Sequence, residues 1–136
     1  MENKDPIRVI ICGDRNYQQA DKIIAFVKSL PEGTTLIEGE AKGADSIARD
    51  AAIACGFDKN HILKFPADWG RFGLYAGPLR NKVMLLQGKP THVVAFHDNI
   101  EGSKGTKHMI GIAEQRNVPV FINPLNWSDI EKNQNT

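Results

Sequence analysis

Arg8-Val9-Ile10-Ile11-Cys12 is the segment from which the architecture of this chain follows most directly. The run is short, almost uniformly apolar and rich in β-branched residues, and it ends at Gly13. Such a run is typical of a central strand covered on both faces, which occurs mainly in parallel sheets. Apolar residues then recur at helical spacing from Ala20 to Leu30, so we predict a helix directly after this strand.

The strand-then-helix pattern repeats along the chain. Further strands are predicted over residues 35–37, 61–65, 91–96 and 118–122, and further helices over residues 44–55, 79–86 and 104–116. Short turns join these elements, which predicts a parallel sheet with helices on both faces in an α/β fold of three α/β/α layers. We expect five strands in the order 3-2-1-4-5, with the fifth at an edge because Pro119 lacks an N–H donor.

The domain organisation is expected to be simple. We predict one domain over residues 1–136, with a core of about residues 7–123 and a C-terminal tail of residues 124–136. Within that tail a short helix is expected to start at Ser128, and residues 131–136 are expected to be frayed.

Composition excludes several classes of protein. Seventeen lysines and arginines face 16 aspartates and glutamates, a net charge of +1, which argues against a dedicated duplex-binding protein and makes a nucleic-acid partner unlikely. Cys12 and Cys55 lie in no C-x-x-C, so we expect both to be buried apolar residues in a reducing compartment. No run reaches membrane-spanning length and residues 1–6 have no apolar signal region, so we expect a soluble cytoplasmic protein without a membrane partner.

The turn after the fourth strand carries the clearest sign of a ligand. Gly102-Ser103-Lys104-Gly105-Thr106 combines glycines, hydroxyls and a lysine at a strand-to-helix turn. Glycine allows close approach of an anion, and the first helical N–H groups and the helix dipole favour negative charge there. The spacing is not that of a Walker A loop, and an ordinary glycine turn is the alternative interpretation.

Two earlier turns carry related chemistry. In Gly13-Asp14-Arg15, the arginine suits a phosphate or carboxylate, while the aspartate suits either a helix cap or a ribose hydroxyl. In the segment Gly39-Glu40-Ala41-Lys42-Gly43-Ala44-Asp45, two glycines again suit close approach of an anion or sugar, and Asp45 suits either capping or ligand contact. The segment is not a G-x-G-x-x-G, so a dinucleotide cofactor gains no support and we expect no cofactor.

Further candidates lie on the next helix and on the segment before it. Arg80 and Asn81 fall on the predicted first turn of a helix, where a guanidinium and an amide can hold a phosphate or a base edge. Residues 66–77 form the longest predicted irregular stretch, and its aromatic residues Trp69, Phe72 and Tyr75 either stack a nucleobase or, the interpretation we favour, pack the loop onto the domain.

The four histidines are the remaining candidates for metal or acid–base chemistry. They show no metal-ligand spacing on a common element, so no metal site is expected. His97 is the only one that we consider for acid–base work, because it follows the fourth strand at the expected edge of the site.

These blocks together resemble the SLOG superfamily of Rossmann-like nucleotide-binding domains, and most closely its small single-domain bacterial and phage subfamily. The resemblance runs from about Arg8 to Phe121. Its blocks are Arg8 to Arg15, Gly39 to Ala48, Phe65 to Trp69, Ala76 to Met84 and Gly102 to Thr106. It implies a Rossmann-like fold and a phosphorylated nucleoside or nucleotide-derived ligand.

The branches of the superfamily imply different activities. The lysine decarboxylase-like phosphoribohydrolases, which cleave the N-glycosidic bond of nucleoside monophosphates, use an arginine matched here by Arg80 and a glutamate whose position here is Met109. Another carboxylate, Glu40, Asp45 or Glu101, would have to replace that glutamate. A DNA-processing branch binds single strands through a motif echoed by Gly39 to Asp45, and other branches are thought to sense or sequester nucleotide signals.

We therefore expect a protein that binds an ADP-ribose-like, cyclic or mononucleotide ligand and senses or sequesters it. Phosphates are expected on Gly102 to Thr106 and near Arg15, the sugar near Gly39 to Asp45, and Arg80 on an anionic group. The alternatives are a phosphoribohydrolase, or a single-strand-binding or structural module.

A homodimer or higher homo-oligomer is also expected. Met84, Leu85 and Leu86 present apolar groups on more than one face of their helix, and the aromatic loop before that helix is apolar as well. A second chain would cover the face that the domain itself leaves open.

Overall fold

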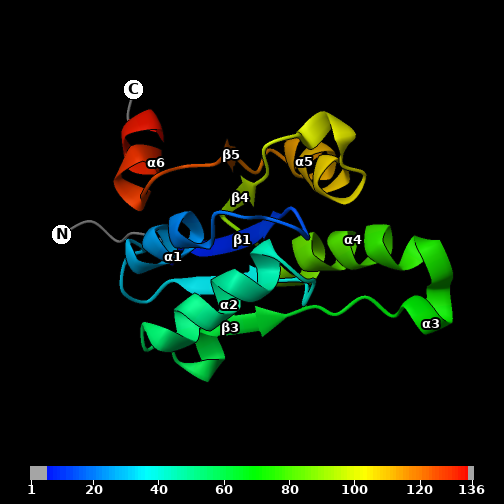
Figure 1. Ribbon diagram of the computed structural model, residues 1–136, viewed down its shortest axis with the longest axis horizontal. Coiled ribbons are helices and arrows are strands. Elements are labelled where there is room, and N and C mark those ends of the chain that lie inside the picture. The colour runs from blue at the N-terminus through cyan, green and yellow to red at the C-terminus, as the bar shows by residue number, and fades with distance from the viewer. Residues whose placement is uncertain (1–5, 135–136) are drawn as a thin grey trace.

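The computed structural model describes residues 6–134, and these form the predicted sheet of five parallel strands in the order β3-β2-β1-β4-β5 (Figure 1). The strands are β1 (Arg8–Gly13), β2 (Thr35–Glu38), β3 (Ile62–Lys64), β4 (His92–Phe96) and β5 (Val120–Ile122). Every residue of β2 and β4 is buried, as are the four central residues of β1. The apolar runs of the sequence therefore lie in the middle of the sheet.

Helices cover both faces of the sheet. They are α1 (Ala20–Lys28), α2 (Ala44–Ala54), α3 (Trp69–Phe72), α4 (Ala76–Gly88), α5 (Gly105–Gln115) and α6 (Trp127–Gln134), with short 3-10 turns η1 (Lys59–His61), η2 (Gly73–Tyr75) and η3 (Ile100–Gly102). Successive side chains of a strand point to opposite faces. Val9 and Ile11 accordingly pack with α1, α2 and α6, whereas Ile10 and Cys12 pack with α4 and α5.

The order of the strands reverses between the two central strands, β1 and β4, and a ligand cleft is expected beyond their carboxyl ends in such sheets. β1 pairs with β2 on one side and with β4 on the other. The Asp14 N–H donates to the Phe96 carbonyl oxygen at 2.9 Å, so the chains after β1 and β4 remain in contact as they leave the sheet. A side chain at Gly13 would collide with that same carbonyl group, which explains the glycine.

The C-terminal region departs from the prediction. The last helix begins at Trp127 and continues to Gln134, so residues 131–134 are helical where we expected fraying, and residues 135–136 lie outside the described part. Trp127 and Ile130 are buried in the core beside α1, and the Trp127 ring meets His92 edge to face with centroids 4.8 Å apart. This burial stabilises the predicted helix, which is longer than we expected from the sequence. The edge position of β5 is confirmed, although Pro119 lies just before the strand.

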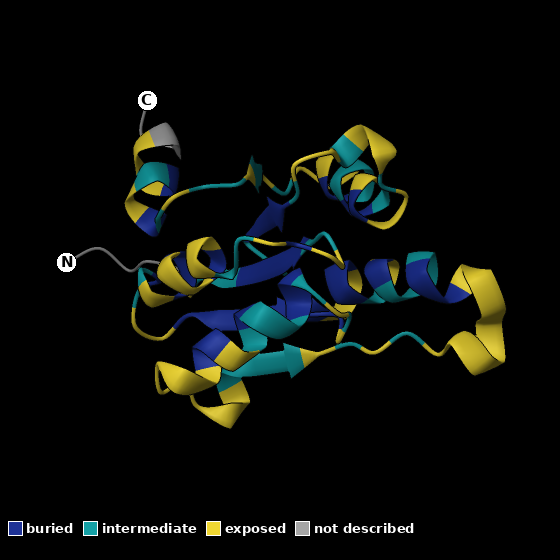
Figure 2. Ribbon diagram, in the orientation of Figure 1, coloured by how far each residue is buried: buried dark blue, intermediate teal, exposed yellow. Residues whose placement is uncertain are grey.

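Residues 66–75 extend away from the sheet at one end of the molecule (Figure 1) and are mostly exposed (Figure 2). We predicted an irregular stretch, but it contains the short helix α3 and the turn η2. Its aromatic side chains pack only partly on the domain, because Trp69 and Tyr75 are each about half exposed and Leu74 is 92% exposed.

Two smaller findings concern the predictions on cysteine and the membrane. Cys55 is exposed at the end of α2, so the expectation that both cysteines are buried holds only for Cys12. Within residues 6–134, no helix has both the length and the apolar composition that crossing a membrane requires.

Candidate functional site

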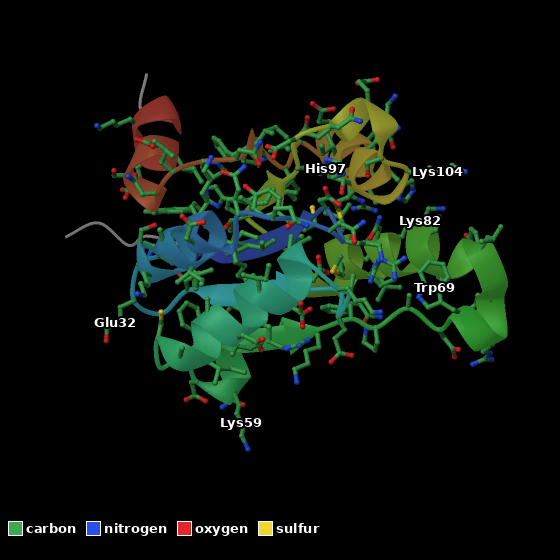
Figure 3. All side chains as sticks on the ribbon, viewed as in Figure 1. Glu32, Lys59, Trp69, Lys82, His97 and Lys104 are labelled. Carbon is green, nitrogen blue, oxygen red and sulfur yellow. The ribbon has the colours of Figure 1, made fainter. Side chains whose placement is uncertain are left out.

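A cleft of about 730 Å³ opens at the carboxyl edge of the sheet. The segments after β1, β2 and β4 meet there with the starts of α4 and α5. Most of the predicted site residues line it, namely Gly13, Asp14, Arg15, Gly39, Glu40, Asp45, Trp69, Arg80, Asn81, Ser103, Lys104, Gly105 and Thr106. In Figure 3, Trp69 and Lys104 lie towards one end of the molecule and Glu32 lies towards the other. The volume is in the range of small-molecule and cofactor pockets.

Three predicted site residues lie outside the lining of this cleft. Glu101 is exposed, and its carboxylate pairs with the Lys107 ammonium group at 2.9 Å. Gly102 belongs to η3, and its N–H donates to the Asn99 side chain at 3.3 Å. Gly43 lies against the backbone of Asp14 and Arg15, where the turn after β2 contacts the turn after β1.

Gly43 allows these two turns to meet. The Ala44 N–H donates to the Asp14 carbonyl oxygen at 3.1 Å, and a side chain at Gly43 would collide with the backbone of Asp14 and Arg15. Asp14 does not cap α1, because its carboxylate accepts from the Asn16 N–H at 2.9 Å within its own turn. The turn itself is therefore held in a fixed shape beside the cleft.

Asp45 shapes the neighbouring turn instead of capping α2. Its buried carboxylate accepts from the Gly39 N–H at 2.8 Å, and α2 begins without a side-chain cap. Burial raises the pKa of Asp45, whereas the Gly39 N–H and the Arg80 guanidinium oppose that rise. Our capping interpretation of Asp45 is thus wrong, and the residue supports residues 39–41 from below.

Arg80 is fixed at the centre of the cleft by its neighbours. Its Nη1 donates to the Gly39 carbonyl oxygen, and its Nε donates to Asn81 Oδ1 at 3.0 Å. A side chain at Gly39 would collide with the guanidinium, so the glycine makes room for it. Among the described residues Nη2 has no hydrogen-bond partner, which leaves two donors of a pre-positioned cation for an anion. Because α4 begins at Ala76, Arg80 lies in the second turn of the helix and not, as we predicted, in its first turn.

The start of α5 faces the cleft from the other side. Ser103 Oγ, one residue before the N-cap position Lys104, accepts from the Thr106 N–H at 3.1 Å in the first turn of the helix. Nothing lies within 4 Å of the position that a side chain at Gly105 would occupy. The space beside Gly105 is therefore empty, as the approach of an anion to this turn would require.

The cleft carries groups of both signs. Its cations are Arg15, Lys42, Arg80 and Lys104, and its carboxylates are Asp14, Glu40 and Asp45. Cations suit phosphate, and carboxylates suit the hydroxyl groups of a sugar. Glu40 has a left-handed backbone with φ of 55°, a conformation that is uncommon outside glycine and that clusters at functional sites.

Sequence reasoning missed several residues of the cleft. Cys12 and Met84 contribute to its apolar lining, together with Met109, which the resemblance had placed at the glutamate position, and burial raises the pKa of the Cys12 thiol. His108 also lines the cleft, beside Asn81. Helical spacing from Gly105 places residues 108 and 109 on the inner face of α5. The sequence could therefore have indicated that His108 lines the cleft. His97, the histidine that we had considered, lines the cleft as well.

Glu38 is a buried carboxylate next to the site. Its Oε1 accepts from the Glu40 N–H at 2.6 Å, and its Oε2 lies 3.7 Å from Arg49 Nη1, too far for a hydrogen bond. Burial raises the pKa of Glu38 to about 7, the Glu40 N–H opposes the rise, and the nearby Asp45 adds to it. Ionised Glu38 is therefore less stable in the folded protein than in water.

The raised pKa of Glu38 predicts that the free energy of unfolding depends on pH. An acid with a raised folded-state pKa stabilises the fold at low pH, and that contribution is lost as the pH rises towards the folded value. Between pH 5 and pH 8 the parent should lose about 2–3 kcal/mol of unfolding free energy that Glu38→Gln does not lose, as urea denaturation at several pH values would measure. The exposed Glu32→Gln is the control. Equal pH profiles for Glu38→Gln and the parent would contradict the prediction.

The fold and the cleft define a Rossmann-like α/β domain with its candidate site at the switch point of the sheet. The chain belongs to the SLOG superfamily, since residues 7–72 match the YspA, cpYpsA-related SLOG family (YAcAr). The Gene 61 protein of Mycobacterium phage D29 is 32% identical over 121 residues, which cover 84% of this chain and 94% of that protein.

A solved structure supports the fold. DNA processing protein A (DprA) from Streptococcus pneumoniae superposes with a TM-score of 0.69 at 17% identity, over 86% of this chain. This chain spans about half the length of DprA, 50% of it being covered. At that identity the likeness concerns the fold alone.

Proposed function

We propose that this protein binds a phosphorylated nucleoside or nucleotide-derived ligand in the cleft at the carboxyl edge of the sheet, and that it senses or sequesters this ligand in the cytoplasm. The main support for the proposal is that two groups able to bind an anion, the Arg80 guanidinium and the N-terminal end of α5, line the same cleft. Arg80 is held in place with two free donors, and the start of α5 is open at Gly105. SLOG membership is consistent with a nucleotide-related ligand.

A panel of nucleotides tests the proposal. AMP, cyclic AMP, ADP and ADP-ribose are each added to the protein, and its thermal unfolding is followed. A ligand bound only by the folded state raises the unfolding temperature by mass action. No shift with any member at millimolar concentration would contradict nucleotide binding and favour a structural module. A shift with a single-stranded oligonucleotide alone would favour the single-strand-binding alternative.

The hydrolase alternative is less well supported. Met109 stands at the glutamate position, is 1% exposed, and is part of the apolar core, so no carboxylate is available there. Glu101 lies outside the cleft and is paired with Lys107, which leaves Glu40 and Asp45. Chromatography of the panel after incubation separates the two functions, because only a hydrolase releases free base.

Arg80→Ala should weaken nucleotide binding by about 1.5–3 kcal/mol, the scale of a charge-assisted hydrogen bond. Arg80→Lys should recover only part of the loss, since a point charge does not reproduce the guanidinium fork. Titration calorimetry measures both. Arg71→Ala, at an exposed arginine outside the cleft, is the control and should bind like the parent. Parent-like affinity of Arg80→Ala would show that Arg80 only supports the Gly39 turn.

We also propose that the protein forms a homodimer through α4. Of the two adjacent leucines of this helix, Leu85 and Leu86, only Leu86 is exposed enough to take part in the contact. Leu85 is 6% exposed and packs in the core, so a charge there would unfold the domain, whereas Leu86 is 53% exposed. Light scattering at micromolar concentration should give a mass above 15.1 kDa for the parent. Leu86→Glu should reduce it to the monomer mass without altering circular dichroism. A parent that is already monomeric refutes the proposal.

A further inference from the structure

His108 is part of a chain of hydrogen bonds that joins three segments of the cleft. Arg80 contacts the Gly39 carbonyl oxygen after β2 and Asn81 Oδ1 on its own helix. Asn81 Nδ2 then lies 3.3 Å from the Gly105 carbonyl oxygen and 3.2 Å from His108 Nδ1, both on α5. The chain therefore runs from the turn after β2 through α4 to α5.

The donors and acceptors of this chain determine the state of the His108 ring. Arginine only donates, so the atom of Asn81 that faces Arg80 Nε is its oxygen. The other end of the Asn81 side chain is then the NH₂ group, whose two hydrogens go to the Gly105 carbonyl and to His108 Nδ1. His108 Nδ1 must accept, which requires a neutral ring with its proton on Nε2.

The surroundings of the ring agree with a neutral state. Burial lowers the pKa of His108, and the positive charge of Lys82 lowers it further. Asn81 is 5% exposed, so the Nδ1 edge of the ring is turned to the interior while the ring lines the cleft. Nε2 has no hydrogen-bond partner in residues 6–134, and it is the edge that remains for a ligand.

We infer that His108 is a specificity residue that donates from Nε2 to an uncharged acceptor on the nucleoside part of the ligand, a base or ribose oxygen or a base nitrogen. The inference rests on the proposed function. A neutral donor suits an uncharged atom, whereas the phosphates have the cations Arg80 and Lys104 in the same cleft. His108 thus distinguishes a nucleoside from a bare phosphate.

Three variants separate ligand recognition from support of the fold. Glutamine places an amide donor near the position of Nε2, whereas asparagine reaches only the position of Nδ1. For AMP, or for ADP-ribose if AMP does not bind, His108→Ala and His108→Asn should each lower affinity about 3- to 10-fold, the scale of one neutral hydrogen bond. His108→Gln should stay within about twofold of the parent. Affinity for inorganic phosphate should be the same in all four proteins.

Long-range ¹H–¹⁵N correlation spectra of the ligand-free protein test the ring directly. The His108 signals, identified by their absence in His108→Gln, should show the Nε2–H tautomer at neutral pH. A protonated Nδ1 would overturn the inference. Parent-like nucleotide affinity of His108→Asn combined with weakened affinity of His108→Gln would overturn it as well. If the parent binds AMP and His108→Ala binds it equally well, the inference fails and the proposed function stands. If the parent binds no nucleotide, the proposed function fails and the inference fails with it.

Discussion

Gly105→Val is expected to abolish nucleotide binding while leaving the stability of the domain nearly unchanged. Gly105 is the first residue of α5 and lines the cleft, and the space beside its Cα is empty to at least 4 Å. A valine side chain would fill the place of a phosphate on the first helical N–H groups. Because no core contact is lost, the free energy of unfolding should change by less than about 1 kcal/mol.

The same helix supplies a matched control. A side chain at Gly111 would also meet nothing within 4 Å, yet Gly111 does not line the cleft. Gly111→Val should therefore bind the panel of nucleotides like the parent. Thermal shift and calorimetry of both variants measure the difference. Normal binding by Gly105→Val would show that the phosphate does not rest on this turn.

Gly43→Ala is expected to lower the free energy of unfolding by about 3–5 kcal/mol. Gly43 has φ of 76°, and a side chain there would collide with the backbone of Asp14 and Arg15, which would have to shift. Two costs add: the strained backbone conformation and the separation of two turns that share a hydrogen bond. Urea denaturation measures the loss.

Gly56→Ala separates these two costs. Gly56 has φ of 88°, similar to that of Gly43, but a side chain there would meet nothing within 4 Å. Gly56→Ala should therefore lower the free energy of unfolding only by the backbone strain, about 1–2 kcal/mol. Equal losses for the two variants would mean that the turns after β1 and β2 do not hold each other in place.

The fold was predictable because its signals are local. The apolar runs of β1 and β4 and the helical spacing after β1 and β2 each suffice to identify an element, and the alternation of elements leaves few topologies. The edge at which the site lies follows from that topology. Gly105 is the first residue of the helix after β4, and Arg80 lies in the second turn of α4, and the structure brings both to the same cleft.

The remaining details depend on tertiary contacts that no local pattern encodes. Asp45 lies in the first turn of α2, but its buried carboxylate accepts from the Gly39 N–H in the preceding turn instead of capping the helix. Leu85 and Leu86 are adjacent in the sequence, and the packing of α4 decides which is buried. His108 acquires its partner from another helix, 27 residues away along the chain, so its ring state depends on how α4 meets α5.

The order of the strands also governs how the protein is made on the ribosome. β1 is complete at residue 13, but β4, its longest-paired neighbour, ends at residue 96. Until the chain has been synthesised beyond that point, one side of the most apolar strand has no partner, and an open strand edge invites pairing with other chains. At about 5–20 residues per second this interval lasts about 4–17 seconds. A nascent chain that stalls between β3 and β4 should therefore be a preferred client for chaperones.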